Sequence, residues 1–162
     1  MQSNGSATTH TPRTAREDRY QHHDYYGVDE LLSPEHLIAR DAVREWVKAE
    51  VSPIIEDYAN RAECPTQLFK GLAEIGAFGP SLPAEYGCGG MDEIAYGVIM
   101  QELERGDSGV RSMASVQGSL VMYPIYKFGS EEQRRHYLPK LASGELIGCF
   151  GLTEPDHGSN PS

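Results

Sequence analysis

The fold of this chain is decided by two adjacent segments, SEEQRRHYLPKLASG (residues 130–144) and ELIGCFGLTE (residues 145–154). In the first, Ser130 and Gln133 have the spacing of a capping box, and Gly144 is placed to end a helix. The second is a short apolar run with a β-branched and an aromatic residue, which is typical of a β-strand. A strand needs neighbours in a sheet, and no partner strand is indicated elsewhere in the chain. The pattern predicts a helical domain followed by the first strand of a sheet.

Helical spacing also covers most of the chain before these segments. Ser33 followed by Pro34 is an N-cap with proline at the first helical position. Pro53 lies inside that helical pattern, and we expect the helix to kink or divide near Val51 because proline removes a backbone donor. Apolar residues recur three or four apart in three further stretches, 68–75, 94–103 and 110–128. Together these patterns predict an all-α bundle, with Gly76 ending the helix at 68–75.

The stretch GPSLPAEYGCGGMD (residues 79–92) is too rich in glycine and proline to continue a helix. A glycine-rich stretch can bind phosphate, but no strand precedes this one and no Gly-Lys-Ser/Thr sequence follows it. We therefore interpret it as a tight connection between helices. Cys88 has no histidine or basic residue nearby in sequence, so we expect a small, partly buried side chain rather than a nucleophile.

Composition narrows the class of protein. The chain has 162 residues, of which 39% are hydrophobic, and this is enough for one ordinary core. The formal net charge of -10 gives no electrostatic reason to bind nucleic acid or an anionic membrane surface. No stretch approaches the roughly 20 apolar residues of a membrane span, so we expect a soluble protein. The three cysteines are widely spaced, which favours reduced thiols in a cytosol or matrix.

The first part of the chain differs from the rest, because residues 1–24 contain almost no aliphatic side chains and predict a mobile polar tail. Its arginines resemble those of organelle-targeting peptides, but its acidic residues do not fit that class. We therefore expect a bacterial cytoplasmic protein rather than one of the mitochondrial matrix. His22 and His23 have no further ligands in view, so no metal site is predicted. The expected organisation is a tail at 1–28, a helical domain at 29–144 and the start of a β-domain at 145–162.

Residues 127–160, KFGSEEQRRHYLPKLASGELIGCFGLTEPDHGSN, closely resemble the helix, strand and flavin loop of the acyl-CoA dehydrogenase family. The resemblance extends back to about Leu32. It implies an N-terminal α-helical domain, then a middle β-domain, then a C-terminal helical bundle. The chain would contain the first domain and the opening strand of the second, so we expect an N-terminal fragment. The family's catalytic glutamate lies on the C-terminal domain, and the resemblance therefore assigns no catalytic residue here.

Within the family, RSMASVQGSL (residues 111–120), which follows ELERGDSGV, is most similar to glutaryl-CoA dehydrogenases. A substrate with a second carboxylate must be desolvated in an apolar pocket, and a charge-assisted partner offsets that cost. Arg111 supplies a bidentate charge, and Ser115 lies four residues later on the same helical face. By spacing alone, such residues on a helix are ordinary surface residues. The resemblance implies that the substrate-binding residues are Arg111, Ser112 and Ser115, with Glu104 near the same end of the pocket.

The resemblance also implies a flavin-binding segment near residue 160. Backbone amides and hydroxyls suit this role because they bond flavin polar edges and phosphate oxygens without filling the space that the ring system needs. Asn160 stands where the family usually has aspartate, and Asp156 and His157 replace a more common pair of small or polar residues. The implied FAD-contacting residues are Phe150, Gly151, Leu152, Thr153, Gly158 and Ser159, and Ser159 is also implied to approach the CoA portion of the substrate.

The reaction implied by the resemblance is α,β-dehydrogenation of an acyl-CoA, in which a carboxylate takes the α-proton and the flavin accepts the β-hydride. In the glutaryl type, which serves lysine and tryptophan degradation, loss of the far carboxylate as carbon dioxide then gives crotonyl-CoA. The implied partners are electron-transferring flavoprotein and further full-length subunits in a tetramer. Two alternatives stay open: an acyl-CoA dehydrogenase of another chain specificity, and a non-catalytic helical module that binds full-length subunits.

Overall fold

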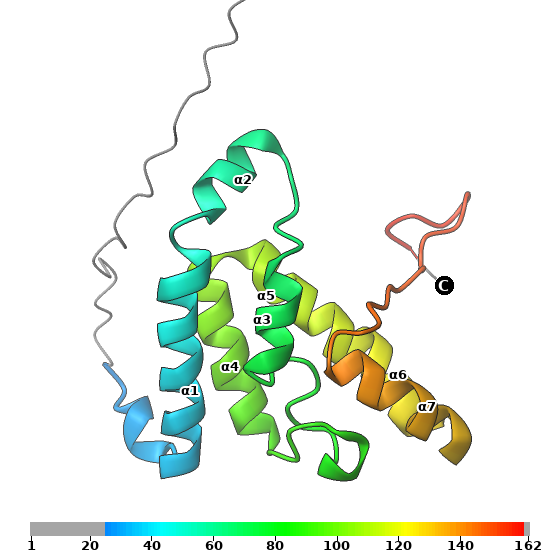
Figure 1. Ribbon diagram of the computed structural model, residues 1–162, viewed down its shortest axis with the longest axis horizontal. Helices are drawn as coiled ribbons and strands as arrows, with labels where there is room; N and C mark the ends of the chain where they lie inside the picture. Colours follow the sequence, from blue (N-terminus) through cyan, green and yellow to red (C-terminus); the bar gives the residue numbers. More distant parts are fainter. Residues whose placement is uncertain (1–24, 161–162) are drawn as a thin grey trace, which may run out of the picture.

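The computed structural model describes residues 25–160, which form a bundle of helices (Figure 1). No strand is present within these residues, which confirms the predicted all-α fold class for the described part of the chain. The α-helices are α1 (Pro34–Trp46), α2 (Ile55–Arg61), α3 (Leu68–Glu74), α4 (Glu93–Gly106), α5 (Ser108–Ser115), α6 (Tyr123–Phe128) and α7 (Glu131–Ala142). The other helical segments are the π-helical η2 (Val47–Val51) and η4 (Val116–Met122) and the short 3-10 helices η1 (Val28–Leu31) and η3 (Ala84–Tyr86).

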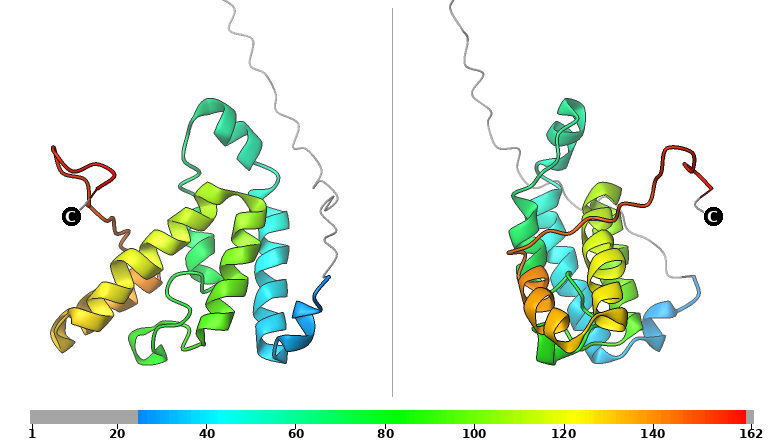
Figure 2. Two further views of the ribbon diagram at one scale, coloured as in Figure 1. Left: turned by 180° about the vertical axis from the view of Figure 1, so that it is seen from behind. Right: turned by 90° about the vertical axis from the view of Figure 1, so that its right-hand side faces the viewer.

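Helices α1 and α4 lie side by side, with α1 at one edge of the bundle (Figure 1). Helix α5, segment η4 and helix α6 follow one another as a long rod that leaves the end of α4 at an angle, and α7 packs back along α6 (Figure 2). We call this unit, residues 108–128, the α5–α6 rod. The core between these elements is apolar and stabilises the fold by removing its side chains from water. Its largest fully buried side chains include Phe78, Leu72, Leu103, Met122 and Leu138.

Three predicted helix ends are confirmed by their hydrogen bonds and backbone angles. At the start of α7, Ser130 Oγ accepts a hydrogen bond from Gln133 N at 3.2 Å, and Gln133 Oε1 accepts one from Ser130 N at 2.8 Å. Gly76 and Gly144 follow α3 and α7 with φ of 72° and 73°, the left-handed conformation that ends many helices. These signals act over a few residues, which is why the sequence pattern was sufficient to find them.

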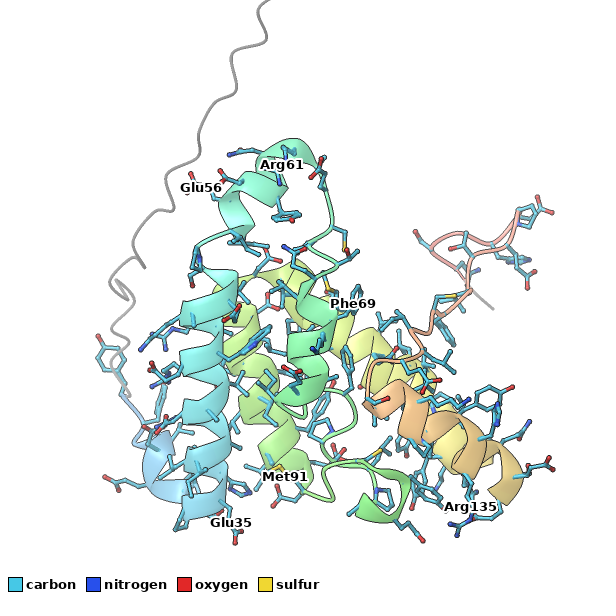
Figure 3. All side chains as sticks on the ribbon, in the orientation of Figure 1. Glu35, Glu56, Arg61, Phe69, Met91 and Arg135 are labelled. Carbon is cyan, nitrogen blue, oxygen red and sulfur yellow. The ribbon has the colours of Figure 1, made fainter. Side chains whose placement is uncertain are left out.

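Pro53 divides the first helical pattern near Val51, as predicted. Helix α1 continues as η2, and the chain then passes through a turn before α2 begins. Glu56 and Arg61 on α2 lie at one end of the bundle, and Glu35 at the start of α1 lies at the other (Figure 3).

His36 joins the N-termini of α1 and α4, a contact that sequence spacing did not indicate. Its Nδ1 accepts a hydrogen bond from Ser33 N, and Ser33 Oγ accepts one from His36 N, both at 3.2 Å. Because Nδ1 is an acceptor, Nε2 carries the proton, and it lies 2.9 Å from each carboxylate oxygen of Asp92. Asp92 also caps α4, and hydrogen bonds from the Ala95 amide and the His36 ring lower the pKa of its carboxyl.

A buried ion pair connects α1 to α4 further along the same two helices. The Glu102 side chain is only 1% exposed. Arg44 of α1 donates to it from both Nε and Nη2, at 2.9 and 2.7 Å, and Arg105 Nη1 lies 3.4 Å away. The two arginines therefore compensate a carboxylate that would otherwise be buried without a counter-charge.

The glycine- and proline-rich stretch is the tight connection that the sequence predicts. The amides of Gly89, Gly90 and Met91 donate to backbone carbonyls of the same stretch, so these amides do not form a phosphate cradle. A Cβ at Gly89 would lie 2.5 Å from the carbonyl oxygen of Pro80, and only glycine allows that backbone approach. Cys88 is half-buried, and desolvation raises the pKa of its thiol to about 11, which agrees with a packing role rather than a nucleophilic one.

The strand predicted for residues 145–153 does not form, and this part of the prediction is wrong for the described chain. The segment bends at residues 145–146, has no regular secondary structure from 147 to 153, and leaves the bundle beyond α7 (Figure 2). An isolated bridge joins Glu154 to His157 through two backbone hydrogen bonds of 3.2 and 3.1 Å. The physical reason is that strand pairing requires a neighbouring strand, and none lies beside this segment within residues 25–160.

Removing residues 150–162 is expected to reduce aggregation of the isolated chain. Phe150 and Leu152 are 50% and 52% exposed, and an apolar extended segment with unpaired backbone groups can pair with another copy of itself. A cut after Cys149 keeps the backbone hydrogen bonds to Gln117, which hold the preceding residues. We expect the shorter chain to elute as a monomer at higher concentration in size-exclusion chromatography. Unchanged or greater aggregation would show that this segment is not the cause.

Residues 1–24 of the predicted polar tail, which include its three arginines and the His22–His23 pair, lie outside the described residues, whereas residues 25–28 are described and Val28 begins η1. Within residues 25–160, no helix is long and apolar enough to cross a membrane, and no group of three His, Cys, Asp or Glu side chains is arranged to hold a metal ion.

Candidate functional site

The candidate site begins at the junction between α4 and α5. Asp107 ends α4 with an extended backbone (φ -168°, ψ 135°), and its Oδ1 accepts a hydrogen bond from Val110 N at 2.9 Å. This cap starts α5 immediately after the break. The change of direction lets a side chain from the last turn of α4 meet side chains from the first turns of α5.

Arg111 and Glu104 make that contact. Arg111 Nε donates to Glu104 Oε2 at 2.6 Å, and Arg111 Nη1 donates to Ser115 Oγ at 3.2 Å. The structure therefore brings together three of the predicted substrate-binding residues. The Arg111 side chain is 34% exposed and that of Glu104 is 45% exposed, so the pair lies at the surface of the described bundle. Arg111 Nη2 has no hydrogen-bond partner within residues 25–160 and can donate to an added acceptor.

Glu104 is held in its charged form by two donors. The guanidinium of Arg111 and the hydroxyl of Ser108 both bond its carboxylate, and these bonds lower the pKa of Glu104. Ser108 was missed by sequence reasoning, although its position four residues after Glu104 was the available signal. The carboxylate thus orients Arg111 from one side and leaves the other side of the guanidinium for a ligand.

The two serines of α5 have different environments. Ser115 Oγ accepts from Arg111 and donates to the carbonyl oxygen of Ser112 at 3.2 Å, so its proton is directed to the backbone. The hydroxyl would need to rotate before it could donate to a substrate carboxylate. Ser112 lies on another face of α5, in the wall of a cavity, and is not part of the Glu104, Arg111 and Ser115 cluster.

This cavity, of about 580 Å³, lies between α2, α3 and the first half of the α5–α6 rod. Its walls are mostly apolar, and the residues that α5 contributes to them carry no charge. The lining includes Tyr58, Phe69, Ser112, Met113, Val116 and Ile147. A cavity of this size and polarity suits apolar groups.

The predicted FAD contacts lie apart from the cluster, on the exposed segment that leaves the bundle (Figure 1). The backbone amides of residues 150–153 donate no hydrogen bond within residues 25–160, and the Thr153 and Ser159 side chains are exposed. These free donors fit the polar edges of a flavin and its phosphates. Within residues 25–160 Arg111 bonds Glu104 and Ser115 and not Ser159, so the substrate contact predicted for Ser159 stays a prediction.

A helical domain with this cluster and this exposed segment can be compared with known proteins. The family model described as "Acyl-CoA dehydrogenase, N-terminal domain" matches residues 33–145. The chain therefore belongs to the acyl-CoA dehydrogenase family.

Individual relatives agree with the family. A probable acyl-CoA dehydrogenase of Bacillus subtilis is 40% identical over 131 residues, which are 80% of this chain and 34% of the relative. A glutaryl-CoA dehydrogenase of Desulfococcus multivorans is 35% identical over 136 residues, covering 82% of this chain and 35% of the relative. The structure is also similar to that of a glutaryl-CoA dehydrogenase from Mycobacterium smegmatis in complex with FADH2, with a TM-score of 0.80, 46% identity, and coverage of 84% of this chain and 35% of that one. The chain thus spans about a third of the length of these relatives.

Proposed function

We propose that this chain is the N-terminal helical part of an FAD-dependent glutaryl-CoA dehydrogenase. In this proposal the intact enzyme oxidises and decarboxylates glutaryl-CoA to crotonyl-CoA, works as a homotetramer, and passes its electrons to electron-transferring flavoprotein. Support comes from the family membership, from the similarity to glutaryl-CoA dehydrogenases, and from the side chains that meet at the start of α5.

The observation that carries the proposal is the orientation of Arg111. Glu104 fixes the guanidinium through Nε, and Nη2 keeps its donors available. A planar guanidinium held in this way matches the two oxygens of a carboxylate. The far carboxylate of glutaryl-CoA is such a group, and a monocarboxylic acyl chain has nothing that needs the charge.

For the cofactor, the amides of residues 150–153 and the hydroxyls of Thr153 and Ser159 would hold FAD, with Phe150 and Leu152 offering apolar contact. When bound, FAD supplies the hydride acceptor of the dehydrogenation. The residues of α5 have another task, because Arg111 and Ser115 bind and orient the far end of the acyl group.

The direct test is the substrate preference of the intact enzyme that carries this segment. We expect kcat/KM to be much higher for glutaryl-CoA than for butyryl-CoA, with crotonyl-CoA and carbon dioxide formed in equal amounts from glutaryl-CoA. A preference for butyryl-CoA or a longer monocarboxylic thioester would favour the alternative of another chain specificity. The observation that favours this alternative is the similarity to a short-chain specific acyl-CoA dehydrogenase of Rattus norvegicus, which is 33% identical over 146 residues.

The isolated chain of 162 residues is expected to be helical, to bind FAD weakly or not at all, and to have no dehydrogenase activity. The physical reason is that its proposed FAD contacts lie on one exposed segment, so most of the flavin would stay in water. The measurements are circular dichroism, flavin fluorescence in a titration with FAD, and reduction of an acceptor dye with glutaryl-CoA. A yellow protein that reduces the dye would contradict this expectation.

A further inference from the structure

Gln117 is a buried polar side chain that ties the C-terminal segment to the α5–α6 rod. It lies in η4 and is 1% exposed. Its Nε2 donates to the carbonyl oxygens of Leu141 at 2.9 Å and Leu146 at 2.8 Å, and its Oε1 accepts from Gly148 N at 2.9 Å. Two carbonyls require the NH2 group and the amide N–H requires the oxygen, so only one orientation of the side chain satisfies all three partners.

Gly148 brings the same segment into close contact with the rod at a second point. A Cβ at Gly148 would lie 2.4 Å from Val121 Cγ1, so the backbone here is closer to η4 than any other residue would allow. Residues 146–148 are therefore held by a hydrogen-bonded side chain and by direct packing. Residues 149–153, which follow at once, have no comparable hold and are exposed.

The α5–α6 rod thus carries two different groups on two sides. Arg111 is on the exposed side, and Gln117 points inward to the end of α7 and to residues 146–148. Only Cys149 separates Gly148 from Phe150, the first of the proposed FAD contacts. The direction in which the FAD-contacting segment leaves the bundle, measured from Arg111, therefore depends on the hydrogen bonds of Gln117.

We propose that Gln117 is a positioning residue of the dehydrogenase. It sets the place of the FAD-contacting segment relative to Arg111, so that the flavin and an acyl group bound at Arg111 meet in a reactive arrangement. Gln117 contacts neither group and acts through residues 146–148. The inference rests on the proposed function, because it takes residues 150–153 to contact FAD.

The test is Gln117→Met in the intact enzyme, because methionine keeps the length of the side chain and removes all three hydrogen bonds. We expect the Kd for FAD, measured by fluorescence titration of the apoenzyme, to rise by about 10- to 100-fold, by analogy with the loss of residues that orient metal ligands. The visible absorption spectrum of the bound flavin should change. We expect a large fall in kcat and only a small change in the KM for the acyl-CoA, because Arg111 keeps its contacts. A lower Tm with unchanged Kd for FAD and unchanged kcat would overturn the inference.

Three further variants keep the test decisive if Gln117→Met folds poorly. Gly148→Ala pushes the same segment off Val121 and leaves Gln117 in place, so it should raise the Kd for FAD in the same way, and adding Val121→Ala should recover part of the loss. Leu138→Ala is the control for general destabilisation, because Leu138 is fully buried and lies outside residues 146–148. It should lower Tm without changing the Kd for FAD, and an equal rise in that Kd would refute a positioning role.

The unaltered enzyme separates failure of this inference from failure of the proposed function. If it binds no FAD, or oxidises no acyl-CoA, the proposed function is wrong. If it binds FAD and oxidises acyl-CoA while Gln117→Met and Gly148→Ala both behave like it, only the positioning role is wrong.

Discussion

Replacing Arg111 with methionine in the intact enzyme should lower kcat/KM for glutaryl-CoA by roughly 30- to 5,000-fold. This factor corresponds to a loss of about 2 to 5 kcal/mol in transition-state binding. Without the guanidinium, the far carboxylate of the substrate would enter the pocket with no counter-charge, and the cost of its desolvation would not be offset. Butyryl-CoA has no such carboxylate, so its kcat/KM should fall far less, or even rise. The measurement is kcat/KM for both thioesters in the parent and in Arg111→Met.

Two controls test whether the loss of activity is specific to the guanidinium of Arg111. Arg135 on α7 is also paired with a glutamate, with its Nε 2.7 Å from Glu131 Oε1, and Arg135→Met should change neither substrate's kcat/KM. Arg111→Lys keeps the charge but loses the planar fork, so it should restore only part of the activity on glutaryl-CoA. Equal losses on glutaryl-CoA and butyryl-CoA in Arg111→Met would mean that Arg111 supports the fold, and the glutaryl assignment would lose its main support.

Replacing Arg44 with methionine should lower the free energy of unfolding of the chain by about 3 kcal/mol, the lower end of the range for a broken buried ion pair. The substitution removes the two shortest donors to Glu102, and that carboxylate is 1% exposed and cannot reach water without a movement of α4. Arg105 keeps one longer contact, which is why we expect the lower end of the range. Urea unfolding followed by circular dichroism measures the change.

The double variant Arg44→Met with Glu102→Leu should recover most of the stability lost in Arg44→Met, because it removes the stranded charge and leaves apolar groups in contact. Lys70→Met is the matched control on a surface pair: Lys70 is 84% exposed, lies 3.6 Å from Glu74, and should contribute little. If Arg44→Met were no more damaging than Lys70→Met, Glu102 would have to be solvated in the native protein, contrary to its burial.

Most of the helical order could be predicted from the sequence because the responsible interactions are local. The capping box of Ser130 and Gln133 and the left-handed glycine at Gly144 each act within one turn. Pro53 acts on its own turn, and the division of the first helix follows from its missing N–H. The positions of Arg111 and Ser115 on one helical face follow from their spacing of four, and the structure confirms that their side chains meet.

The strand predicted at residues 145–153 does not form, and the physical reason also explains why the helices could be predicted. A helix satisfies its backbone within itself, so a local pattern is sufficient, whereas a strand is completed by another strand that local sequence does not supply. The apolar pattern indicates a preference for extended backbone, but no neighbour pairs with the segment in the described chain, and residues 147–153 have no regular secondary structure.

Most of the helices, several of their ends, the family and the face of α5 that carries Arg111 could be established from sequence, since each of these depends on residues a few positions apart or on a long continuous motif. Which polar side chains are buried, and what they bond, depends instead on how the helices pack. Glu102 meets Arg44 across 58 positions, His36 meets Asp92 across 56, and Gln117 meets Gly148 across 31. A buried polar group is tolerated only when its partners are brought to it, and in this domain the packing of α1, α4, α7 and the α5–α6 rod brings them together.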